Sequence, residues 1–87
     1  MVQRETCRAR DALHAWLREN DKTQAWLARM VGVSAPSVVS WLDGSSRPIT
    51  HLRDVIARLT GIAVEDWDYP SETQAREQAL ARIAEAT

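Results

Sequence analysis

The sequence lacks phenylalanine and has one cysteine, three glycines and three prolines among its 87 residues. The lone Cys7 excludes an intramolecular disulfide and a cysteine-rich metal site, and we expect it to be a small residue on the first helix. No apolar run approaches the roughly 18 residues of a membrane-spanning helix. The N-terminal segment does not have the pattern of a signal peptide. We therefore expect a soluble, cytoplasmic protein.

A strong net charge is also lacking, since the chain carries only −1 at neutral pH. Residues 1–58 hold nine Lys and Arg against six Asp and Glu, a net of +3, whereas residues 59–87 hold two against six, a net of −4. A basic body with an acidic tail is compatible with nucleic acid on one face and another partner elsewhere. The length suffices for one small domain.

Apolar spacing predicts an all-α chain. Five helices are expected, over residues 3–19, 23–32, 35–42, 50–60 and 65–67. Together they form a compact five-helix domain that spans residues 1–68. A C-terminal helical extension follows at 69–87, with Ser71 and Gln74 in a capping box. The predicted inward stripes are Ala9, Leu13, Trp16 and Leu17 in the first helix and Leu52, Val55, Ile56 and Leu59 in the fourth.

The stretch from residue 23 to 44 carries the most information. Gly32 ends one helix, and Ser34 is suited to cap the next, which has Pro36 in its first turn, where a missing N–H costs least. Val38 and Trp41 then follow at six and nine residues beyond Gly32. This is the spacing of a helix-turn-helix unit.

At these positions the chain resembles the phage repressor and Cro type of helix-turn-helix domain, the XRE family. The residues that match the family pattern are Gln24, Leu27, Ala28, Gly32, Val33, Ser34, Val38, Trp41 and Gly44. The resemblance extends from about Leu13 to Trp67. It implies a repressor-like fold in which residues 35–42 form the recognition helix in the DNA major groove.

The resemblance also implies which residues contact DNA. Gln24 would bind a phosphate from the start of the second helix, and Arg47, in the loop after the recognition helix, is the leading phosphate donor. The recognition helix has no Arg, Lys, Asn or Gln on its outward face, so we expect thymine-methyl contacts and hydroxyl bonds rather than bidentate base reading. The full set of expected DNA contacts is Gln24, Ser34, Ala35, Pro36, Ser37, Val39, Ser40, Ser45, Ser46 and Arg47.

Several apolar residues have two interpretations each. Trp26 either packs on the first helix or marks a partner surface. Ile62 and Trp67 either form a dimer contact, as the family resemblance suggests, or are buried within the monomer. Leu80 and Ile83 form a narrow strip that suits a second copy or a partner, or else is exposed to solvent.

The sequence shows no catalytic residues and no cofactor motif. It also shows no metal site, because His14 and His51 lie in different helices without metal-ligand spacing. The leading hypothesis is a transcriptional regulator, a prophage-type repressor or antitoxin, that binds an inverted-repeat operator in double-stranded DNA as a homodimer and is nucleoid-associated when bound. The alternative is a helix-turn-helix fold that serves as a protein-interaction module, such as an antitoxin-like or anti-regulator partner. The alternative predicts that Gln24→Ala and Arg47→Ala leave activity intact while changes at Trp26 or Leu80 abolish it.

Overall fold

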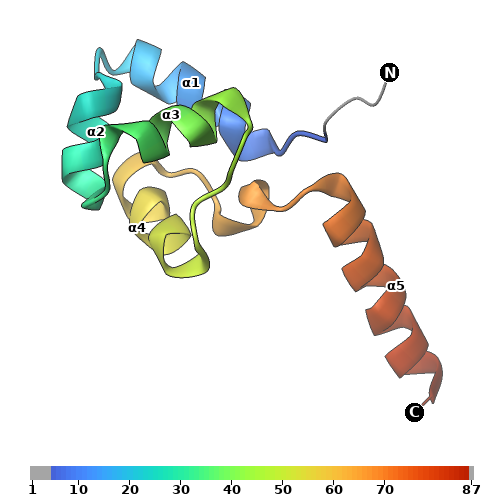
Figure 1. Ribbon diagram of the computed structural model, residues 1–87. Helices are drawn as coiled ribbons and strands as arrows, with labels where there is room; N and C mark the ends of the chain where they lie inside the picture. The colour runs from blue at the N-terminus through green and yellow to red at the C-terminus, as the bar shows by residue number, and fades with distance from the viewer. Residues whose placement is uncertain (1–4, 87) are drawn as a thin grey trace, which may run out of the picture.

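The computed structural model describes residues 5–86, and within that range it is all-helical, without strands, as the sequence predicts. The elements are α1 (Arg8–Glu19), α2 (Gln24–Val31), α3 (Ala35–Asp43), α4 (Thr50–Thr60), the 3₁₀ helix η1 (Val64–Trp67) and α5 (Pro70–Ala86). Helices α1 to α4 gather with η1 into one body, and α5 projects away from it (Figure 1). The projection of α5 fits the elongated outline of the molecule, 48 × 35 × 22 Å.

The core lies among α1, α2, α3, α4 and η1. Its centre consists of side chains with little or no solvent exposure, chiefly Leu13, Leu27, Val38, Ile56 and Trp67. The predicted stripe of α1 is buried at Ala9, Leu13 and Leu17, because these positions recur on one face of the helix. Helix α5 contributes no buried residue.

Two expectations about the helices are wrong, namely the start of the first helix and the burial of Val55, whereas the short fifth helix is present. The first helix begins at Arg8 rather than residue 3, and Cys7 precedes it as a buried N-cap, while residues 3 and 4 lie outside the described range. The short helix near residue 65 is a 3₁₀ helix. Val55 is 39% exposed, since α4 buries Ile56 fully and turns Val55 to its outer side.

The start of the last helix also differs from its prediction. Helix α5 begins at Pro70, so Ser71 is already helical and does not cap it. The carboxylate of Glu72 instead accepts the backbone N–H of Tyr69 at 2.7 Å, and the backbone N–H of Ser71 donates to Glu5 at 2.7 Å. Because its missing N–H favours the first helical position, Pro70 starts the helix two residues earlier in the chain than a cap at Ser71 would.

Candidate nucleic-acid interface

Helices α2 and α3 are joined by a short turn whose geometry follows from three residues. Gly32 adopts φ +87°, the left-handed conformation that favours glycine, and its N–H donates to the carbonyl of Ala28 at 2.9 Å. The N–H of Val33 donates to the same carbonyl, also at 2.9 Å. Ser34 then caps α3 by accepting the N–H of Ser37, and the two hydroxyls are 2.9 Å apart. The predicted cap at Ser34 and the predicted helix end at Gly32 are confirmed.

Helix α3 has an inner and an outer face. Val38, Trp41 and Leu42 are buried, which fixes the helix against the core. The predicted DNA contacts lie on the other side: Ser34, Ala35, Pro36 and Val39 are exposed, and Ser37 and Ser40 are half-buried. Val39, at 46% exposure, is the large apolar side chain of this face. The structure therefore gathers these six residues on one accessible surface, which we call the α3 outer face.

Gln24 occupies the first helical position of α2 and is exposed. Its predecessor Thr23 caps the helix by accepting the N–H of Trp26 at 3.0 Å. Trp26 stacks on Trp16 with ring centroids 5.9 Å apart, and the ammonium of Lys22 lies 4.9 Å from the Trp26 ring. Of the two interpretations of Trp26, packing against the first helix is the one observed.

The loop after α3 is shaped by its own side chains. The carboxylate of Asp43 accepts the backbone N–H of Ser45 at 2.7 Å and also the Ser45 hydroxyl. The N–H of Ser46 donates to the carbonyl of Ser40 at 3.3 Å. Ser45 and Ser46 are exposed, but the Ser45 hydroxyl already has an acceptor within the protein.

Arg47, expected to be the leading phosphate donor, is half-buried and contacts the start of α5. Its Nη1 donates to Glu72 Oε1 at 2.5 Å and to the carbonyl of Trp67 at 3.1 Å, and its Nη2 lies 3.4 Å from Glu72 Oε2. The guanidinium also lies over the Tyr69 ring, 3.8 Å from its centroid. We call this set of contacts the Arg47 clasp.

The charges of the clasp stabilise each other. Burial lowers the pKa of Arg47, but the hydrogen bond and charge of Glu72 more than offset this and raise the pKa above its ordinary value. The hydrogen bond from Arg47, and then the N–H of Tyr69, hold the pKa of Glu72 below its ordinary value. Both groups therefore remain charged at neutral pH, and the guanidinium has an internal counter-ion.

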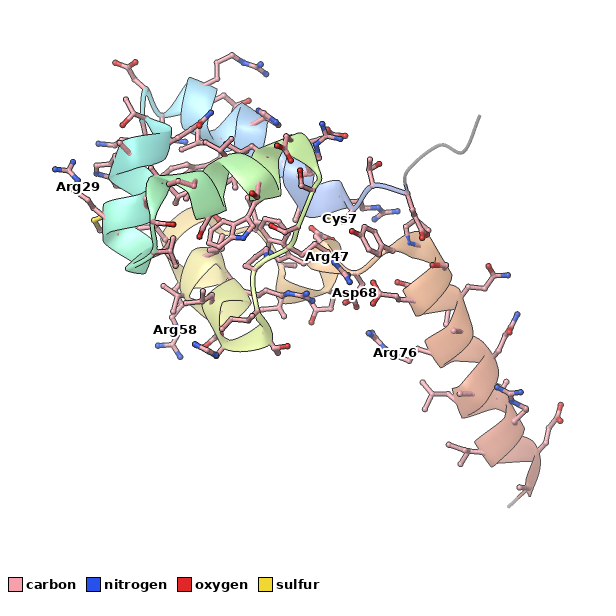
Figure 2. All side chains as sticks on the ribbon, in the orientation of Figure 1. Cys7, Arg29, Arg47, Arg58, Asp68 and Arg76 are labelled. Atoms are coloured by element: carbon pink, nitrogen blue, oxygen red, sulfur yellow. The ribbon has the colours of Figure 1, made fainter. Side chains whose placement is uncertain are left out.

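Three further polar contacts lie beside the clasp. Arg76 of α5 donates to Asp68 at 2.6 Å, and Asp68 also lies 3.5 Å from Arg53 of α4. Figure 2 shows Arg47, Asp68 and Arg76 where α5 joins the body. The hydroxyl of Ser71 donates to Glu5 at 2.8 Å, which links the N-terminal segment to the same region.

Sequence reasoning missed how the end of α3 is held. Arg10 Nε donates to the carbonyl of Leu42 at 2.8 Å, and His14 Nε2 donates to the same carbonyl at 2.8 Å. The two donors are four residues apart on one face of α1, a spacing visible in the sequence, but nothing there indicates the carbonyl they meet. Donors at a helix C-terminus satisfy carbonyls that have no partner within the helix.

The predicted dimer residues divide into two groups. Ile62 is 7% exposed and Trp67 is fully buried in the monomer, where the Trp67 ring meets Trp41 edge to face at 6.5 Å. Of the two interpretations of this pair, burial within the monomer is the one observed. Leu80 and Ile83, on α5, are 58% and 61% exposed.

No protein-family model, curated protein or solved structure matches this chain. Among residues 5–86, no group of three His, Cys, Asp or Glu side chains is placed to hold a metal ion. Within the same range no helix has both the length and the apolar character to cross a membrane.

Proposed function

We propose that this protein is a DNA-binding transcriptional regulator that uses the α3 outer face in the major groove and binds an inverted-repeat operator as a homodimer. The observation that carries the proposal is the placement of α3. Its inner side is fixed by Val38, Trp41 and Leu42, while its outer side and its capped N-terminus are accessible. An exposed helix held rigidly against a second helix is the arrangement that major-groove readers of this type need.

The chemistry of the α3 outer face indicates how DNA would be read. Ala35, Pro36 and Val39 offer methyl and methylene groups to thymine, and Ser37 and Ser40 offer hydroxyls. None of these makes the bidentate bonds that discriminate guanine or adenine most strongly. Specificity would therefore depend on thymine methyls and DNA shape, with Gln24 and the α2 N-terminus positioning the backbone. Repression would follow from blocking access of polymerase to the operator.

The test is selection of bound duplexes from a random library, followed by fluorescence anisotropy with the enriched sequence and a scrambled one. We expect an inverted repeat with half-sites about 10 base pairs apart, bound about a thousandfold more tightly than the scrambled duplex. Val39→Glu should abolish this preference, because it places a negative charge against the groove. Val55→Glu, an equally charged change at an exposed valine of α4, should preserve it.

A protein-interaction module is the second candidate, and a specific observation favours it. Val39 of the α3 outer face is a large apolar side chain that is 46% exposed, and Arg47, the cation of the neighbouring loop, is engaged by Glu72. The DNA proposal would be rejected if the selection enriched no sequence and if Val39→Glu and Val55→Glu both bound duplexes weakly and equally. Under this alternative, Val39→Glu would disrupt protein binding while Gln24→Ala would not.

A further inference from the structure

The attachment of α5 to the body is polar. The helix buries no residue, and its first two turns carry the polar contacts with the body, where Ser71 meets Glu5, Glu72 meets Arg47 and Arg76 meets Asp68. Ion pairs of this exposure are weak and sensitive to salt. A competing anion can therefore displace such a contact without disrupting the hydrophobic core.

Arg47 is the member of this set that belongs to the proposed DNA interface. It lies four residues after the end of α3, in the loop that leads from this helix to α4. Both terminal nitrogens face Glu72, the Trp67 carbonyl takes a further hydrogen bond, and the Tyr69 ring covers one face of the guanidinium. In this state three of the five guanidinium N–H groups are directed at acceptors within the protein, and the paired N–H groups of Nη1 and Nη2 face the Glu72 carboxylate.

We propose that Glu72 holds Arg47 away from DNA, so that the Arg47 clasp is an autoinhibitory contact through which α5 regulates the α3 interface. This inference rests on the proposed DNA-binding function. A carboxylate and a phosphate both accept the paired N–H groups of arginine, so each can replace the other as its partner. The Glu72 side chain is 43% exposed and the Arg47 side chain 23% exposed, so the pair is accessible to a competing anion.

The exchange has a defined consequence for α5. When Arg47 moves to a phosphate, the first turn of α5 loses its contact with the loop, and the helix remains joined to the body through Ser71 and Arg76. A partner that holds α5 on the body would thereby oppose DNA binding, and one that draws α5 away would promote it. DNA binding and α5 docking are therefore thermodynamically linked, such that each lowers the affinity of the other.

Glu72→Gln is the informative variant, because glutamine removes the charge but keeps an oxygen that can accept the Tyr69 N–H at the start of α5. Its control is Glu77→Gln, which makes the same change of charge on the same exposed helix, at a residue that has no bond with Arg47 in the described structure. Any general effect of removing one negative charge near DNA appears in both variants.

The experiment measures affinity for the selected duplex by anisotropy over a range of salt concentrations, using the full chain. Beyond the effect of Glu77→Gln, we expect Glu72→Gln to tighten binding about two- to fivefold, the range set by a partly exposed ion pair. Adding Arg47→Ala to Glu72→Gln should remove this gain and reduce the salt slope by about 0.9, the contribution of one phosphate contact. Amide hydrogen exchange in residues 71–76 of the unmodified protein should accelerate when the duplex is added.

The outcomes separate the two proposals. If the unmodified protein binds its selected duplex but Glu72→Gln and Glu77→Gln behave alike, the clasp is not inhibitory and the inference is overturned while DNA binding stands. A gain from Glu72→Gln that persists in the Arg47→Ala background would also overturn it. If neither the unmodified protein nor any variant prefers one duplex over another, the proposed function itself fails, and the inference fails with it.

Discussion

Trp41 of α3 and Trp67 of η1 meet edge to face with their ring centroids 6.5 Å apart. The two residues are far apart in the chain, and their contact joins the proposed recognition helix to the last segment of the body. Trp67 is fully buried and Trp41 is 5% exposed. The position of α3 therefore depends on η1, a four-residue 3₁₀ helix.

Trp67→Ala should destabilise the protein by about 3–5 kcal/mol, the usual cost of removing a large buried aromatic side chain. Urea unfolding followed by far-UV circular dichroism measures this. Val55→Ala, at an apolar residue that is 39% exposed, serves as the control and should change the free energy of unfolding by less than about 0.5 kcal/mol. Equal effects of the two variants would mean that Trp67 is not part of the core.

Gly32→Ala and Gly44→Ala should differ in cost although both glycines have φ +87°. At Gly32 an added Cβ meets no atom within 4 Å, so the cost is that of the left-handed backbone, about 1–2 kcal/mol. At Gly44 the Cβ also meets Arg10 Nη1 at 3.3 Å and disturbs the donor to Leu42. Gly44→Ala should therefore cost more, as measured by urea unfolding, and the difference should shrink in an Arg10→Ala background. A persistent difference there would show that Arg10 is not its cause.

The Arg47 clasp should weaken in acid. The pKa of Glu72 is lowered in the folded protein, so its stabilising contribution is complete above the unfolded-chain value of 4.5 and is lost as pH falls through the lower folded-state value. Carbon-detected NMR titration of the Glu72 carboxylate should give a midpoint below 4.5. In Arg47→Ala the midpoint should rise toward 4.5, and an unchanged midpoint would show that Arg47 is not the main cause.

Residues 1–69 should fold without α5, because that helix buries no side chain. A chain ending at Tyr69 should unfold cooperatively, with a Tm within about 4 °C of the full chain, a shift that corresponds to less than about 1 kcal/mol for a domain of this size. Differential scanning calorimetry of both chains tests this. Loss of the cooperative transition would instead place α5 within the folding unit.

Local sequence determined most of the helical framework. Thr23 and Ser34 cap their helices, and Gly32 and Gly61 end theirs in the left-handed conformation, because capping and glycine chemistry act within a few residues. Apolar spacing likewise identified the buried residues of α1 and α3, since one face of each helix must leave water. The same periodicity predicts the residues of the α3 outer face, because they occupy the helical positions that do not belong to the buried stripe.

The tertiary structure decided the partners of the side chains. Whether Trp67 faces the core or a second copy depends on Trp41, which the sequence could not place opposite it. The family resemblance implies that Arg47 contacts a phosphate, yet in the structure its charge is matched by Glu72, 25 residues further along the chain. Pairings of this kind follow from how the elements fold together, and neither local propensity nor periodicity contains that information.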